Sequence, residues 1–263
     1  MMKTFQIIES DDRFRFLNDI FNSNGIKSSL VKHIDEINCD NIILPILTTR
    51  DRTTISGTDI KINDLSLKIA DDSTIFCGKQ ELLNGKFNDK IKVFDYSSSE
   101  LFLLKNAELT SYGILKILFE HSKKTFNKIR ILISGFGRIG KTLTKLLVGL
   151  NCDIYVLGNK EKDSFWINNF GANELKKLRD LKFDFIINTV PSMIFSNEII
   201  KNVNFETFFI DVSSKNGIDK KSCEENKMKY LQALGIPGRY FPYEAAEIIK
   251  DSIFNIIGEK WKT

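Results

Sequence analysis

The sequence predicts an α/β protein of two domains joined by a long helix. Three observations lead to this fold class. Short apolar runs alternate with helical segments through both halves of the chain, which is the order that gives parallel sheets with crossovers. A glycine-rich turn follows one of the apolar runs in the second half. The 263 residues, 42% of them hydrophobic, are enough to bury two separate cores.

The first half is predicted to form a small parallel sheet. Strands are expected at residues 5–8, 28–31, 41–44, 74–77 and 91–94. Between the first two strands, Phe14, Leu17 and Phe21 recur at the spacing of one helix face. Buried-type strands with crossovers between them are typical of a parallel sheet. Residues 1–105 are therefore expected to form a Rossmann-like or flavodoxin-like domain on the substrate side.

The second half is predicted to form a doubly wound sheet after a bridging helix. Leu109, Leu115 and Phe119 fit the period of a long helix, which is expected within residues 106–127. Strands at 129–134, 153–157, 183–188, 207–211 and 229–231 then alternate with helical stretches. This domain is expected to span residues 128–240. The remaining segment, 241–263, is expected to contain a helix from about 242 to 257 that could pack back on the first domain.

The motif that carries chemistry is Gly-x-Gly-x-x-Gly at Gly135, Gly137 and Gly140, placed between a predicted strand and a predicted helix. Gly135 would allow the tight turn, Gly137 would let a pyrophosphate approach the backbone, and Gly140 would let the helix pack closely on the strand. Free N–H groups at the helix start, around Arg138 and Ile139, would then face the anion. The context predicts a nicotinamide-nucleotide-binding Rossmann domain.

The end of the next strand favours NADP over NAD. NAD-dependent enzymes commonly place an acidic side chain there to bind the ribose hydroxyls. Here the strand ends in Leu157, Gly158, Asn159 and Lys160, without a carboxylate. A 2′-phosphate would meet a neutral or cationic pocket, so Asn159 and Lys160 are predicted to contact it. The alternative is that Lys160 is a solvated loop lysine.

Three further loops follow strands and are candidates to line the site. Thr189, Val190 and Pro191 are expected on the nicotinamide side, and Ser213 follows the next strand. A loop rich in glycine and proline, residues 235–239, precedes the last helix. For each loop, the alternative is an ordinary connection between a strand and a helix.

Composition excludes several other classes of function. The four cysteines lie far apart and the chain has only two histidines, so neither a metal site nor a Ser-His-Asp centre is expected. The net charge of +4 comes from lysines spread along the chain, without the basic block that nucleic acid would require. No apolar run approaches the roughly 18 residues of a membrane span, and the start lacks a secretory signal. A cytoplasmic protein is expected.

Several segments, in order across nearly the whole chain, resemble the A subunit of dipicolinate synthase from endospore-forming bacteria. They are Asn41-Ile-Ile-Leu-Pro45, Asn106-Ala107 with Thr110 and Gly113, the glycine motif, Ile187-Asn-Thr-Val-Pro-Ser-Met-Ile194, Ile210-Asp-Val-Ser-Ser214 and Leu234-Gly-Ile-Pro-Gly238. The chain departs from the family pattern at Tyr112, where the family usually has an acidic residue. It departs again around Glu244, in the segment after Gly238.

The resemblance implies a two-domain protein that works with a second, flavoprotein-like B subunit. Together they would use NADP to oxidise a dihydrodipicolinate-type cyclic dicarboxylate to dipicolinate, in the mother-cell cytoplasm during sporulation. Two other functions remain open, an NADP-dependent imine or keto-acid reductase and a non-catalytic nucleotide-sensing module. The sequence also leaves open whether the chain forms a homo-oligomer.

A dicarboxylate substrate would need cations to hold it. Arg239 is the first candidate because a guanidinium group binds a carboxylate bidentately. Arg50 and Arg52 are weaker candidates. Asn106 and Tyr112, both on the bridging helix, are the remaining candidates for a catalytic role, with Glu108 between them.

Overall fold

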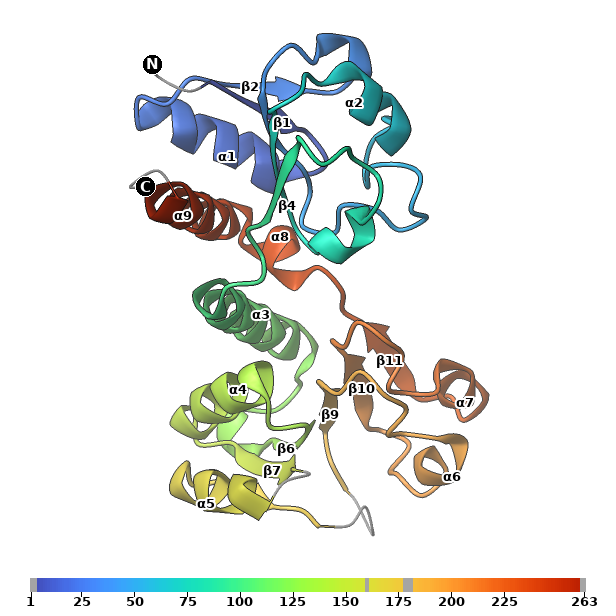
Figure 1. The fold of residues 1–263 in the computed structure, drawn as a ribbon. Helices are drawn as coiled ribbons and strands as arrows, with labels where there is room; N and C mark the ends of the chain where they lie inside the picture. The colour runs from blue at the N-terminus through green and yellow to red at the C-terminus, as the bar shows by residue number, and fades with distance from the viewer. Residues whose placement is uncertain (1–3, 159–160, 177–181, 261–263) are drawn as a thin grey trace. The chain divides into compact units, whose positions relative to one another are not determined.

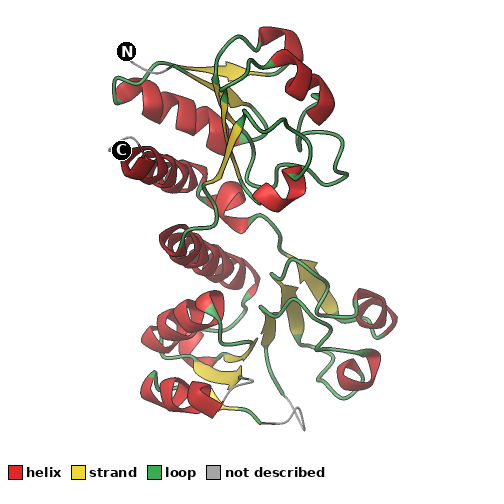
Figure 2. Ribbon diagram, in the orientation of Figure 1, coloured by secondary structure: helices red, strands yellow, loops and turns green. Residues whose placement is uncertain are grey.

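The computed structural model describes residues 4–158, 161–176 and 182–260. The chain divides into two compact units, of which the first combines Met1–Asn106 with Pro237–Thr263 and the second is Ala107–Ile236. Each unit is built on one sheet, of five strands in the first and six in the second (Figures 1 and 2). All strand pairs are parallel. The predicted fold class is confirmed.

The first unit has the strand order β2-β1-β3-β4-β5. Its strands are β1 (Phe5–Ile8), β2 (Ser28–Val31), β3 (Asn41–Ile43), β4 (Thr74–Cys77) and β5 (Lys92–Asp95). The chain runs from β1 to β2 on one side and continues on the other side with β3, so the strand order reverses between β1 and β3. This is the flavodoxin-like order, in which ligands bind at the carboxyl ends of the two strands where the order reverses.

Two long helices lie side by side in the first unit (Figure 1). Helix α1 (Asp12–Ser23) begins after the N-cap Asp11, and α9 is Pro242–Lys260. Aromatic rings join the two helices, with Phe21 5.4 Å from Phe254 between ring centroids. The unit also contains α2 (Ile62–Lys68) and the short 3₁₀ turns Ile34–Glu36 and Gln80–Leu83. The last helix of the chain therefore packs on the first.

The second unit has the strand order β11-β10-β9-β6-β7-β8, which is the doubly wound Rossmann order. Its strands are β6 (Arg130–Ser134), β7 (Asp153–Leu157), β8 (Asn173–Glu174), β9 (Phe185–Asn188), β10 (Phe208–Asp211) and β11 (Lys229–Gln232). Its helices include α4 (Arg138–Gly149), α5 (Glu161–Asn169), α6 (Asn197–Ile200) and α7 (Lys220–Glu225), with a 3₁₀ turn at Phe126–Lys128. The order reverses between β6 and β9.

Helix α3 (Glu100–His121) runs from the first unit into the second. It begins and ends earlier than the predicted 106–127. Its start is set by Ser99, whose hydroxyl accepts a hydrogen bond from the Phe102 N–H at 3.1 Å, as an N-cap does. Among the described residues, no helix is long and apolar enough to cross a membrane.

Strand β8 and helix α8 were not predicted from the sequence. Strand β8 has only two residues, and both are polar, so it lacks the apolar run that marks the other strands. Residues 235–239 were predicted as a loop, but residues 236–239 belong to the short helix α8 (Ile236–Tyr240). It follows Gly235, whose φ of +65° sets the turn, and it carries Pro237 in its first turn, where the missing N–H costs no hydrogen bond. Arg239 thus lies on a helix instead of a loop.

Candidate functional site

The glycine turn in the second unit is held by two close approaches. Gly135 has a φ of +95°, and a Cβ there would lie 2.5 Å from Thr189 Oγ1 and 2.7 Å from Val190 Cγ2. A Cβ on Gly140 would lie 2.2 Å from the carbonyl oxygen of Gly135. Real Cβ atoms do not approach other atoms this closely. The fold itself therefore requires glycine at positions 135 and 140.

Gly137 is different, because nothing in the described chain requires it to be glycine. Its φ is −80°, which any residue can adopt, and no described atom lies within 4 Å of the position a Cβ would occupy. It is the N-cap of α4, which has no side-chain cap and no acidic residue in its first turn. The N–H groups at the start of α4 are therefore not capped by a side chain, beside open space, which suits an anion.

The loop after β9 completes this corner of the unit. The backbone N–H and the hydroxyl of Thr189 both donate to the carbonyl oxygen of Ser134, at 2.9 and 2.8 Å. Thr189 and Val190 are half-buried, whereas Pro191 is exposed. The structure thus brings three predicted residues together, Gly135 with Thr189 and Val190. It does so at the carboxyl ends of β6 and β9, where the strand order reverses.

A buried polar network supports the loops after β9 and β10. The Asp211 carboxylate accepts from Asn188 Nδ2 at 3.0 Å, from the Ser213 hydroxyl at 2.6 Å and N–H at 3.1 Å, and from the Gly217 N–H at 2.8 Å. Asn188 Nδ2 also donates to the Val190 carbonyl oxygen at 2.9 Å. Asn188 and Asp211 are fully buried. A buried carboxylate is stable only with such donors, so this network fixes both loops.

The network changes the interpretation of Ser213. Its side chain is buried and its hydroxyl is hydrogen-bonded to Asp211, so it holds the loop after β10 in position. Asn188 and Asp211 were missed as individual site residues. Their signal in the sequence was a polar residue closing an otherwise apolar strand, in Phe185–Asn188 and again in Phe208–Asp211.

The predicted phosphate contacts Asn159 and Lys160 lie outside the described residues. Near them, the structure adds a carboxylate that sequence reasoning missed. Asp163, in the first turn of α5, is buried, and its Oδ2 lies 3.5 Å from the place where a Cβ of Gly158 would be. This carboxylate is directed against the backbone at the end of β7 instead of into solvent.

The remaining candidates are spread over the two units. Asn106 is half-buried and Tyr112 is 42% exposed, both on α3. A separation of six residues turns them by about 120° around the helix axis, so they do not share one face. Arg239 is exposed on α8, with its guanidinium 5.4 Å from the ring centroid of Tyr240. Arg50 and Arg52 are also exposed.

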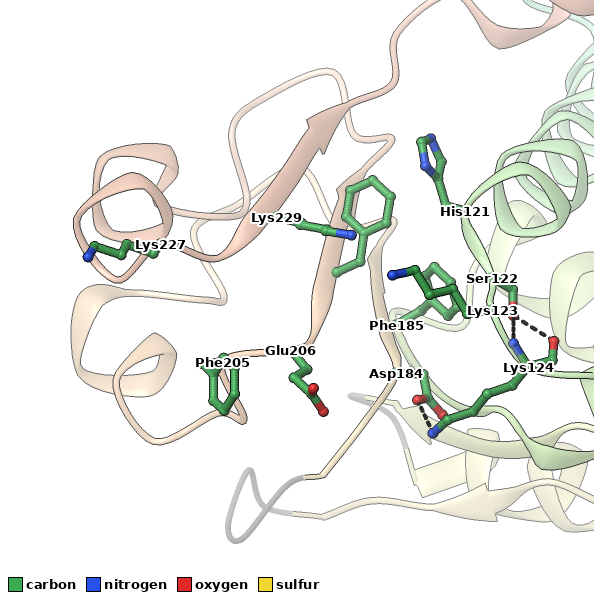
Figure 3. Close-up of a pocket in the computed structure, with 11 residues that line it drawn as sticks. His121, Ser122, Lys123, Lys124, Asp184, Phe185, Phe205, Glu206, Lys227 and Lys229 are labelled. Carbon is green, nitrogen blue, oxygen red and sulfur yellow. Dashed lines mark hydrogen bonds and ion pairs between the residues drawn. The ribbon is translucent and has the colours of Figure 1, made fainter.

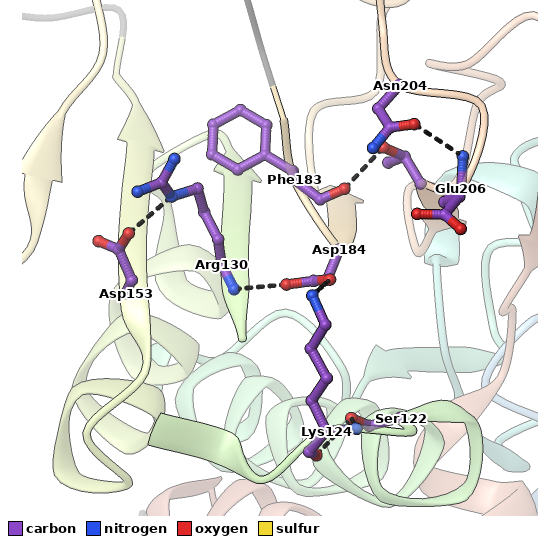
Figure 4. Close-up of polar contacts among 9 residues, drawn as sticks. Ser122, Lys124, Arg130, Asp153, Phe183, Asp184, Asn204 and Glu206 are labelled. Atoms are coloured by element: carbon purple, nitrogen blue, oxygen red, sulfur yellow. Dashed lines mark hydrogen bonds and ion pairs between the residues drawn. The ribbon is translucent and has the colours of Figure 1, made fainter. Parts of the chain in front are cut away.

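A pocket of about 410 Å³ lies at the opposite, amino-terminal edge of the second sheet (Figure 3). Lys123, Lys227 and Lys229 border it. Inside it, Asp184 accepts from Lys124 Nζ at 2.6 Å and from the Arg130 N–H at 2.9 Å (Figure 4). These bonds tie the start of β6 to the start of β9. Ligands of open parallel sheets bind at the other edge, so this pocket is not the candidate site.

Fold and site together define a two-domain α/β protein with a parallel, Rossmann-like sheet in each domain. The crystal structure of D-lactate dehydrogenase with NAD⁺ from Lactobacillus jensenii matches with a TM-score of 0.56 at 10% identity, covering 96% of each chain. This likeness shows the shared fold alone.

The more particular likeness is to the A subunit of dipicolinate synthase. The chain is 25% identical to the Bacillus subtilis (strain 168) protein over 253 residues, covering 90% of this chain and 84% of that protein. The crystal structure of the Bacillus halodurans protein matches with a TM-score of 0.85 at 20% identity, covering 97% of this chain and 98% of that one. No family model matches the chain. The resemblance predicted from the sequence is confirmed.

The Asp211 network predicts an unequal response to Asp→Asn substitution. In Asp211→Asn, an amide NH₂ would replace an oxygen that faces N–H donors, which should lower the free energy of unfolding by about 2–3 kcal/mol. Asp219→Asn is the matched control, because Asp219 accepts from the Ser222 N–H as an N-cap and asparagine caps helices equally well. Urea unfolding of both variants tests this. Equal losses would contradict the role assigned to the network.

Proposed function

We propose that this chain is an NADP-binding oxidoreductase subunit that converts a dihydrodipicolinate-type cyclic dicarboxylate to dipicolinate. The observation that carries the proposal is the open position at Gly137, beside the start of α4, which has no side-chain cap. A glycine that the protein does not need for its own packing is explained by a ligand that approaches the backbone there. The likeness to the A subunit of dipicolinate synthase, over most of the chain, supports the substrate.

The residues present fit a dinucleotide. Gly137 and the N–H groups of Arg138, Ile139 and Gly140 would hold the pyrophosphate, since the first turn of α4 contains no acidic residue to repel it. Thr189, Val190 and Pro191 would line the nicotinamide side, with Ser213 and its network holding their loop in place. A bound nicotinamide nucleotide would supply the hydride acceptor.

The proposed reaction is an aromatisation. A bound NADP⁺ would supply the acceptor for a hydride from a dihydropyridine dicarboxylate, and a base would take the proton, so the products would be dipicolinate and NADPH. Formation of the aromatic ring supplies driving force, so the chain's main task is to orient the substrate and exclude water. Arg239 is proposed to bind a carboxylate, and Asn106 and Tyr112 on α3 are proposed to contact the reacting ring.

We also propose a flavoprotein-like B subunit, encoded separately, as the partner of this chain. The Bacillus subtilis relative is named as the A subunit of its synthase, which supports the existence of a second subunit. The site of action would be the mother-cell cytoplasm during sporulation.

The turnover experiment supplies the purified chain, alone and with its flavoprotein-like partner, with freshly generated dihydrodipicolinate precursor and NADP⁺. We expect NADPH absorbance to rise together with dipicolinate. Pyruvate and cyclic imines with NADPH serve as comparison substrates. Faster oxidation of NADPH on those compounds would favour a keto-acid or imine reductase. Tight nucleotide binding without turnover on any substrate would favour a nucleotide-sensing module.

The contacts of the three glycines predict that one substitution affects NADP⁺ binding and another affects the free energy of unfolding. Gly137→Ala should weaken NADP⁺ binding at least tenfold while changing the free energy of unfolding by less than about 1 kcal/mol. Gly140→Ala should lower the free energy of unfolding by about 1–3 kcal/mol, because its Cβ would overlap the Gly135 carbonyl. Gly149→Ala, at the open end of α4, is the control for both measurements. Nucleotide titration and urea unfolding provide the readouts, and unchanged NADP⁺ binding in Gly137→Ala would refute the proposed role.

The end of β7 predicts nucleotide preference. The chain should bind NADP⁺ at least tenfold more tightly than NAD⁺, a difference of about 1.4 kcal/mol. Lys160→Ala should remove most of that difference, because it should weaken binding of NADP⁺ and leave binding of NAD⁺ unchanged. Lys162→Ala, which removes an exposed lysine of α5, is the matched control. Tighter binding of NAD⁺ by the unaltered chain would show that Asp163 or another group at this end favours a free ribose.

A further inference from the structure

The first unit contains its own point where the strand order reverses, between β1 and β3. The carboxyl ends of these two neighbouring strands lie at one edge of the sheet, where open α/β sheets bind ligands. The residues that follow β1 are Glu9, Ser10 and Asp11, and α1 then begins with Arg13 in its first turn. Glu9 and Asp11 are acidic, so the group of this segment that could bind a carboxylate is the guanidinium group of Arg13.

Arg13 is a charged side chain held in a fixed position. Only 17% of its side chain is exposed. Its Nε and Nη2 donate to the two carboxylate oxygens of Asp11 at 2.9 and 2.6 Å, and the same carboxylate caps α1. Burial by itself lowers the pKa of Arg13, but the hydrogen bonds and charge of Asp11 outweigh this effect and raise it above the ordinary value. The guanidinium group stays cationic.

The second support of Arg13 is the backbone of α8. A Cβ on Gly238 would lie 2.5 Å from Arg13 Nε and 2.8 Å from its Cζ, so a side chain at position 238 would displace the guanidinium group that packs there. Arg239 follows directly on the same short helix. The Gly-x-Pro-Gly segment, residues 235–238, thus provides a backbone surface on which the Arg13 guanidinium group packs.

Several hydrogen-bond donors at this edge have no acceptor. A guanidinium group has five N–H donors, and Asp11 receives one from Nε and one from Nη2. Within the described chain, Nη1 of Arg13 has no acceptor, and the buried hydroxyls of Ser10 and Ser56 have no hydrogen-bond partner. Gly57 packs on Ser10, since its Cβ would lie 2.8 Å from the Ser10 carbonyl oxygen.

We propose that Arg13 binds one carboxylate of the dicarboxylate substrate through its free guanidinium N–H groups, an inference that rests on the proposed function. Asp11 and Gly238 are positioning residues that fix the guanidinium plane. A guanidinium fork matches the two oxygens of a carboxylate, which a lysine cannot reproduce. Arg13 and Arg239, linked through neighbouring positions of α8, would serve two carboxylates of one ligand.

The test compares two ligands, pyridine-2,6-dicarboxylate and pyridine-2-carboxylate, by equilibrium dialysis against the full chain with NADP⁺ present. The unaltered chain should bind the dicarboxylate at least tenfold more tightly. In Arg13→Lys, binding of the dicarboxylate should weaken 10- to 100-fold and its advantage over the monocarboxylate should shrink. Binding of NADP⁺ and the melting temperature should remain nearly unchanged. Arg15→Lys on the same helix is the matched control, because the Arg15 side chain is 58% exposed and pairs with Glu9.

A second variant separates orientation from charge. Gly238→Ala would displace the guanidinium group without removing it. It should therefore weaken binding of the dicarboxylate as Arg13→Lys does. If the unaltered chain binds the dicarboxylate and Arg13→Lys retains the tenfold preference, the inference is wrong and the proposed function stands. If the unaltered chain binds no dicarboxylate, the proposed function and the inference fail together. A fall in melting temperature with no change in ligand preference would assign Arg13 a structural role alone.

Discussion

The close approach of Gly135 to the loop after β9 is the contact on which the candidate site in the second unit depends. The left-handed turn at Gly135 directs the chain from β6 into α4. That turn is possible only because no Cβ stands between the Gly135 backbone and Thr189, and because Gly140 lets α4 rest on the Gly135 carbonyl. If either contact were lost, the start of α4 would move away from the sheet edge. The position and direction of the uncapped N–H groups at Gly137 follow from these two contacts.

The buried network at Asp211 provides the counterpart on the other side of the point where the strand order reverses. The turn at Gly135 is fixed by close backbone contacts. The loops after β9 and β10 are instead held in position by hydrogen bonds between their side chains and backbone. Asn188 joins the two loops because its amide donates both to Asp211 and to the Val190 carbonyl. Desolvation makes an unpaired group costly here, so the network has few alternative arrangements. The same property that makes the loops stiff makes them sensitive to a single substitution.

The sequence predicted the elements that are marked by a local pattern of residues. It missed those that are defined by contacts between residues far apart in the chain. Strands such as Phe5–Ile8 and Asp153–Leu157 were predicted at their observed bounds because apolar runs mark them. The glycine loop was also predictable, since its spacing reflects backbone geometry. Strand β8 has no apolar run, and α8 begins with residues typical of a loop. Arg13 gave no signal because its partner Gly238 is far away in the sequence, and only the folded chain brings the two together.

The two units offer different groups for binding an anion, and this difference fits the ligands proposed for them. At Gly137, backbone N–H groups face an open position, and the first turn of α4 has no acidic residue. Such donors bind a pyrophosphate without selecting the rest of the molecule, which suits a cofactor that many enzymes share. At Arg13, a guanidinium group of fixed orientation has free donors. Its planar fork discriminates by shape, because a ligand without a matching carboxylate leaves those donors unpaired. In this proposal, selectivity for the substrate would depend on a side chain and binding of the nucleotide on the backbone, so each could change by substitution without disturbing the other.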